Sequence, residues 1–201
     1  MADGVTVTGD TLRLGSGSSV GDVFANTLQI DPDALVRGSI GIPTLPVISP
    51  FCEVPHVACG ATDVRVAPGQ SLGPLAPGTY GRLRVLNGGL LTLQPGAFVF
   101  CDIKAGRGAT IRTLGQATLD VAAGKVTIGT GSFLGPTQGT DPILVNVAGR
   151  SVRVSASAVA NAVFVAPNAN MSFGRGARLV GCFCTHRAKS DKGITLQCPA
   201  P

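Results

Sequence analysis

The chain has 201 residues, of which 44% are hydrophobic and 13% are charged, and this balance excludes an intrinsically disordered chain. It contains 28 glycines and 14 prolines but a single glutamate, Glu53, which excludes a helical bundle. The net charge of +5 is spread along a sequence with one tyrosine and no tryptophan, so we expect no nucleic-acid partner. No stretch approaches 18 uninterrupted apolar residues, so we also expect no transmembrane segment.

The first part of the chain, residues 1–42, contains short alternations of apolar and polar residues between glycines. Leu12-Arg-Leu14 and Leu28-Gln-Ile30 are examples, and this period of two is typical of β-strands. We expect these N-terminal strands to belong to the same domain as the strands that follow. Residues 43–78 are rich in proline and show little periodicity, so we interpret this range as a connector or excursion.

Residues 79–201 repeat the strand pattern many times, with breaks that contain glycine. Such strands could form an antiparallel sandwich or barrel, or a parallel solenoid. Asn-Gly, the strongest hairpin signal, occurs once, at Asn87-Gly88, whereas most breaks are single small residues or Gly-X-Gly. We therefore predict an all-β fold, a single-domain parallel β-helix (β-solenoid) with a Pro-rich connector and about six coils of roughly 20 residues in 79–201.

The chain has six cysteines, and an even count with short spacings favours disulfides formed in an oxidising compartment. We therefore expect an extracellular or cell-surface protein. Cys52 and Cys59 bracket a short Pro-containing segment, and we predict that they are bridged. Cys182 and Cys184 would point the same way on a strand and cannot reach each other, so Cys101 and Cys198 are the candidate partners.

A metal site is the alternative for these cysteines, although we expect neither a metal nor another cofactor. Cys182, Cys184 and His186 would lie on one face of a strand and could bind Zn²⁺. Cys52, His56 and Cys59 form a second Cys/His group, but Cys-X-Cys is a weaker zinc signal than a repeated Cys-X-X-Cys.

Several short motifs resemble those of bacterial secreted or surface right-handed parallel β-helix domains, whose shape is related to that of bactofilins. The segments that carry this resemblance are LAPGTYGRL (75–83), LLTLQPGAFVF (90–100) and VFVAPNANM (163–171), followed by GRG (174–176) and AKS (188–190). The resemblance implies an exported or envelope-associated solenoid. Cys182, Cys184 and His186 depart from the family pattern, so any role for them is specific to this chain.

Candidate catalytic groups are scattered, and we predict that the protein is not an enzyme. The close carboxylate pair, Asp31 and Asp33, is typical of a turn, and there is no Gly-X-Ser-X-Gly motif. Five threonines could line an ice-binding face, but their irregular spacing favours ordinary strand threonines: Thr92, Thr110, Thr118, Thr127 and Thr195. Seven arginines occupy outward strand positions and could form either a solvated face or a surface for an anionic polymer: Arg82, Arg84, Arg112, Arg150, Arg153, Arg175 and Arg178.

The favoured function is a non-enzymatic extracytoplasmic structural or interaction module, a disulfide-stapled β-solenoid for surface display or assembly. The alternative is a carbohydrate-binding or carbohydrate-cleaving β-helix domain. The candidate partners are a second copy of the chain, a cell surface or an anionic polymer. Because an open solenoid leaves unpaired ladders at its ends, we predict association through the N-terminal end or lateral faces, with the C-terminal end closed by Cys198, Pro199 and Pro201.

Overall fold

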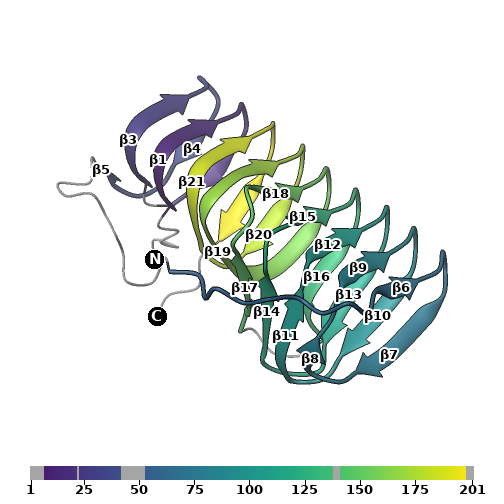
Figure 1. Cartoon of the computed structure of the whole chain (residues 1–201). Helices are drawn as coiled ribbons and strands as arrows, with labels where there is room; N and C mark the ends of the chain where they lie inside the picture. The colour runs from purple at the N-terminus through teal and green to yellow at the C-terminus, as the bar shows by residue number, and fades with distance from the viewer. Residues whose placement is uncertain (1–6, 22, 42–52, 138–140, 198–201) are drawn as a thin grey trace.

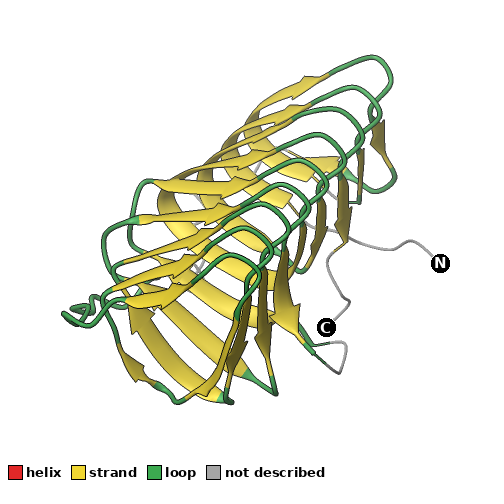
Figure 2. Cartoon of the chain, turned by 90° about the vertical axis from the view of Figure 1, so that its right-hand side faces the viewer, coloured by secondary structure: helices red, strands yellow, loops and turns green. Residues whose placement is uncertain are grey.

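The computed structural model describes residues 7–21, 23–41, 53–137 and 141–197. Within these ranges the chain forms strands and turns without a helix, and the strands stack in parallel into one solenoid of about nine turns (Figures 1 and 2). The predicted all-β solenoid is therefore confirmed. No helix long and apolar enough to cross a membrane is present in the described part of the chain.

The strands of successive turns stack in three columns, each named here as a face of the solenoid. The basic face contains β6 (Val64–Val66), β9 (Arg82–Val85), β12 (Asp102–Ala105), β15 (Lys125–Ile128), β18 (Ser151–Val154) and the C-terminal parts of β19 (Val159–Phe173), β21 (Phe183–Ser190), β1 (Val7–Leu14) and β3 (Val23–Ile30). The covered face contains β8 (Gly78–Thr79), β11 (Gly96–Phe100), β14 (Ala117–Val121), β17 (Ile143–Val147), the middle of β19, the N-terminal parts of β21, β1 and β3, and β5 (Ile40–Gly41). The third face contains β7 (Ser71–Leu75), β10 (Leu90–Leu93), β13 (Thr110–Thr113), β16 (Phe133–Pro136), the start of β19, β20 (Arg178–Val180), β22 (Thr195–Gln197), β2 (Ser19–Val20) and β4 (Leu35–Val36).

The interior is a continuous apolar core, because every second strand residue points inward and stacks on its equivalent in the next turn. Leu83, Ile103 and Val126 form one such stack, and all three are fully buried. Phe98 and Phe100 stack with ring centroids 6.2 Å apart, and Phe173 and Phe183 make a second ring contact in the later turns. The alternation seen in the sequence is thus the alternation between core and solvent.

The turns do not follow chain order along the axis. The N-terminal strand β1 pairs with β21 near the C-terminus, and β2 pairs with β22, so the N-terminal turns extend the solenoid beyond the C-terminal turn (Figure 1, purple beside yellow). We call the contact between β1–β2 and β21–β22 the junction. The described solenoid therefore ends at the turn of β6–β8 and, at its other end, at the turn of β3–β5.

Hydrogen bonds across the junction complete the strand ladder. The Ser190 hydroxyl accepts a bond from the Gly15 amide at 3.0 Å, and the Ser19 amide donates to the Ile194 carbonyl at 3.3 Å. Our prediction that the C-terminal tail closes this ladder is therefore wrong, because the N-terminal strands supply the missing backbone partners. Residues 198–201, on which that prediction rested, lie outside the described residues.

Residues 53–63, which we call the strap, lead along the outside of the solenoid into its first turn. Figure 1 shows the strap passing in front of β17, β14 and β11 of the covered face. The Gly60 amide donates to the Tyr80 carbonyl at 2.8 Å. On the covered face Asp120 and Asn146 occupy outward positions, yet they are only 9% and 7% exposed, and the Asn146 amide donates to the Asp120 carboxylate at 2.7 Å. The covered face therefore buries a hydrogen-bonded polar pair at outward strand positions.

The Pro-rich range 43–78 includes strands at its C-terminal end. Val64 and Val66 are buried in β6, and β7 pairs with β10 on the third face. The solenoid therefore begins within the range that we interpreted as a connector.

Candidate anion-binding face

One outward position on the basic face carries a row of positive charges. Strand register places these residues side by side in successive turns. From the β6 end the row, which we call the basic ladder, reads Arg65, Arg84, Lys104, Thr127, Arg153, Ser172, Lys189, Arg13 and Gln29. Six of these nine positions are arginine or lysine, so the ladder is a linear array of cations parallel to the solenoid axis.

Each ladder cation is held in place by the core on either side of it. Leu83 and Val85 flank Arg84, and Val152 and Val154 flank Arg153, with all four apolar residues fully buried. Because neighbouring strands lie about 4.8 Å apart, the ladder from β6 to β1 covers about 34 Å. The buried neighbours keep the cations pointing outward along this whole length.

Few carboxylates neutralise this face. Asp102 pairs with Arg84 and lies 3.9 Å from the Arg82 guanidinium. These are the ion pairs found among the residues that the structure describes. Like charges opposite each other on adjacent strands are destabilising. The remaining cations therefore leave a positive field that an acidic partner would relieve.

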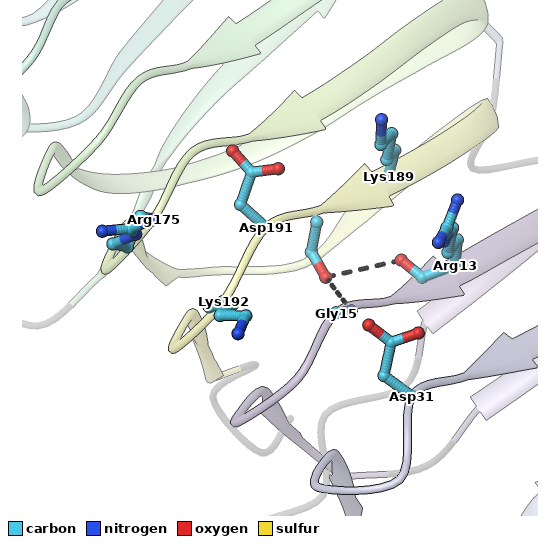
Figure 3. A pocket seen from close by; sticks show the side chains of 8 residues that line it. Arg13, Gly15, Asp31, Arg175, Lys189, Asp191 and Lys192 are labelled. Carbon is cyan, nitrogen blue, oxygen red and sulfur yellow. Dashed lines mark hydrogen bonds between the residues drawn. The ribbon is translucent and has the colours of Figure 1, made fainter.

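A groove of about 400 Å³ lies beside the junction, at the edge of the basic face (Figure 3). Residues from β1, β21 and neighbouring turns line it: Arg13, Gly15, Asp31, Arg175, Lys189, Ser190, Asp191 and Lys192. The Asp31 carboxylate accepts a hydrogen bond from the Ser16 amide at 3.1 Å, while Asp33 accepts one from the Ser16 hydroxyl at 3.0 Å. Four cations and two carboxylates thus meet in one concavity.

The arginines singled out from the sequence do not all share a face. Arg82, Arg84 and Arg153 lie on the basic face, whereas Arg112 lies on the third face, and there its Nε donates to the Thr92 hydroxyl at 3.0 Å. The others lie on the third face or in turns: Arg178 in β20, and Arg150 and Arg175 outside the strands.

Sequence reasoning missed most of the ladder. Arg13, Arg65, Lys104 and Lys189 belong to it and were not among the candidates. A usable signal was present, because each ladder cation is the centre of a triplet whose outer residues point inward, as in Val64-Arg65-Val66 and Ile103-Lys104-Ala105.

The five threonines also lie on different faces. Thr92, Thr110 and Thr195 belong to the third face, Thr118 to the covered face and Thr127 to the basic face. They do not form one flat threonine surface.

The disulfide between Cys59 and Cys101 ties the strap to the solenoid, with a Cα–Cα distance of 5.0 Å. The predicted Cys52–Cys59 bridge is therefore wrong, because folding brings the strap against the turn that precedes β12. Cys101 is likewise not the partner of Cys182 or Cys184. Cys52 and Cys198 lie outside the described residues.

Cys182 and Cys184 are themselves disulfide-bonded, so they offer no thiolate to a metal. This overturns the zinc alternative for Cys182, Cys184 and His186. Across the described ranges, no group of three or more His, Cys, Asp or Glu side chains could hold a metal ion.

The solved structures with a similar fold include two ice-binding proteins. The first is a glycosylated ice-binding protein (LeIBP) from Arctic yeast, with a TM-score of 0.50 and 13% identity over 100% of this chain and 92% of that chain. The second is an ice-binding protein from the Antarctic ascomycete Antarctomyces psychrotrophicus, with a TM-score of 0.48 and 14% identity over 100% and 96% of the two chains. No protein family model matches, and no curated protein matches in sequence. At this identity the likeness to the yeast protein supports the β-solenoid fold alone.

Proposed function

We propose that the protein is an interaction module that works outside the cytoplasm and binds an anionic polymer along its basic face. The observation that carries this proposal is the basic ladder, in which six of nine register-matched positions are arginine or lysine. A compact anion would contact one or two of these cations. A linear polymer that lies along the axis would contact most of them.

The chemistry of the face favours an acidic glycan over a nucleic acid. Proteins that bind single strands combine cations with aromatic side chains on which bases stack. The outward residues of the basic ladder include no aromatic ring, and the rings of Phe98, Phe100 and Phe164 are buried in the core. A polymer whose recognition depends on charge and hydroxyl groups suits this surface better.

The proposal is one of binding without catalysis. Glycoside hydrolysis uses a pair of carboxylates that flank the scissile bond. On the basic face Asp102 is engaged by Arg84, and none of the nine residues of the basic ladder is a carboxylate. The disulfides support a site of action in an oxidising compartment, where such a rigid solenoid can present its faces to a surface polymer.

Charge reversal on the ladder should weaken binding to polygalacturonate, a linear polyanion. Arg153→Glu removes one cation from the ladder and adds a repelling anion, so we expect about tenfold weaker binding, or about 1.4 kcal/mol. Isothermal titration calorimetry at low salt measures this change. The wild-type affinity should also fall steeply as salt rises.

Arg178→Glu is the matched control, because it makes the same charge change on the third face. It should alter the affinity by less than twofold. Equal losses for both variants would show that net charge alone attracts the polymer, and an absence of binding to polygalacturonate, heparin and polyphosphate at low salt would overturn the proposal.

Ice binding on the third face is a second candidate function. This face is less charged than the basic face and is not crossed by the strap. One of its outward rows combines hydroxyl and apolar side chains with one cation, Arg178, and reads Ser71, Leu90, Thr110, Phe133, Val159, Arg178, Thr195 and Ser19. A surface of this composition is a candidate for contact with ice, and the yeast protein of similar fold is described as ice-binding.

Thr110→Arg would place a bulky cation in the middle of this row. If the third face binds ice, we expect the wild-type protein to inhibit ice recrystallisation and the variant to lose most of that inhibition. Arg153→Glu on the basic face should leave it unchanged. Wild-type protein that fails to inhibit recrystallisation at micromolar concentration would exclude this candidate.

A further inference from the structure

We propose that the groove beside the junction recognises a single sugar-acid unit and so directs the basic face to polyuronates. This inference rests on the proposed function, because the groove continues the basic ladder at Lys189 and Arg13. It goes further by assigning a chemical class to the polymer. The argument depends on which charged groups line the groove and on what shapes its floor.

Two cations at one edge of the groove are positioned to hold a carboxylate. Arg13 and Lys189 are register partners on β1 and β21, and both side chains are exposed. Figure 3 shows them next to each other, with Arg175 and Lys192 on the opposite side. None of the four forms an ion pair with another described residue. Their charges remain available to an acidic ligand.

The floor of the groove is built by the junction itself. The Ser190 hydroxyl, which is buried, accepts a hydrogen bond from the Gly15 amide. A Cβ at Gly15 would lie 2.7 Å from the Ser190 carbonyl oxygen, so only glycine allows the two turns to approach this closely. The groove therefore exists only where the N-terminal turn is stacked on the C-terminal turn.

Asp31 and Asp191 give the groove its selectivity. A carboxylate accepts hydrogen bonds from hydroxyl groups and repels any anion, and it repels a multiply charged phosphate more strongly than the single carboxylate of one sugar unit, whose hydroxyls can offset the repulsion. Asp31 is held by the Ser16 amide, while Asp191 projects from the turn after β21 beside Lys189 (Figure 3). A sugar acid offers both a carboxylate for the cations and hydroxyls for these aspartates. A polyphosphate offers only negative charge.

The size of the groove agrees with such a ligand. Its volume of about 400 Å³ lies within the range of small-ligand sites. One sugar unit in the groove, with the rest of the chain along the ladder, would fix the end or the register of the polymer. Recognition would then combine a specific contact at the junction with distributed charge elsewhere.

Calorimetry with two short probes, tetragalacturonate and tripolyphosphate, tests the inference. In Asp31→Asn/Asp191→Asn, asparagine at position 31 keeps an acceptor for the Ser16 amide. We expect this variant to bind tetragalacturonate about tenfold more weakly and tripolyphosphate more tightly than the wild type. In Arg13→Gln/Lys189→Gln, binding of both probes should fall.

Arg65→Gln/Lys104→Gln, at the far end of the ladder, is the matched control. This variant should bind the long polymer polygalacturonate more weakly than the wild type does, and it should bind tetragalacturonate with the wild-type affinity. If the aspartate variant keeps the wild-type preference between the two probes, the inference is overturned. The proposed function still stands in that case, provided that Arg153→Glu weakens binding to polygalacturonate. If the wild-type protein binds no polyanion, both the inference and the proposed function are wrong. Thermal unfolding of each variant shows whether a loss comes from the groove or from misfolding.

Discussion

Replacing Cys59 and Cys101 together by alanine is expected to lower the free energy of unfolding by about 4 kcal/mol. The bridge joins residues 42 apart in sequence, and closing a loop of that length removes about this much chain entropy from the unfolded state. At roughly 2–4 °C per kcal/mol for a chain of this size, the melting temperature should fall by about 10 °C. Circular dichroism during heating measures the change.

The same substitution should loosen the strap before the solenoid unfolds. The amides of Gly60 and Gly81, which donate to Tyr80 and Thr62, should exchange hydrogen faster in the variant. His56→Ala, an exposed change on the same segment, is the control and should leave both measurements near wild type. A fall in melting temperature of less than about 2 °C would show that the strap is held by other contacts.

Gly149→Ala is expected to destabilise the protein by about 3 kcal/mol or to prevent folding. Gly149 lies between β17 and β18, where the chain turns from the covered face to the basic face. A Cβ there would overlap the Gly124 carbonyl oxygen of the preceding turn and lie 3.0 Å from that of Ala123. Because both obstacles are backbone atoms in a stacked ladder, relief requires the turns to separate. Urea unfolding measures the loss.

Gly131→Ala separates crowding from backbone strain. Gly131 has a φ of 65°, a backbone conformation that alanine adopts only with strain. A Cβ added there would have no other part of the chain within 4 Å, so the substitution introduces strain without a steric clash. We expect a loss of about 1 kcal/mol. Similar losses of unfolding free energy at the two positions would contradict the view that contact with the preceding turn excludes a side chain at Gly149.

The strand pattern and the solenoid class could be read from the sequence because both depend on local features. Alternation such as Leu83-Arg84-Val85 specifies a strand with one buried side, and short glycine-containing breaks turn the chain without forming hairpins. The triplets centred on Arg65, Arg84 and Lys104 also encode outward cations. The residues of the basic ladder are therefore local in origin, even though they were not recognised as a set.

Tertiary structure alone decided which turns stack and which side chains meet. Nothing local to Thr11 or Arg13 indicates that β1 pairs with β21, because any solenoid turn offers a similar open ladder to the next. The pairing of Cys59 with Cys101 depends on the path of the strap, and the groove depends on stacking that brings Asp31 and Lys189 to the same concavity. Sequence thus determined the repeating unit, whereas the order of the units, set by backbone pairing between distant segments, determined the disulfide and the candidate site.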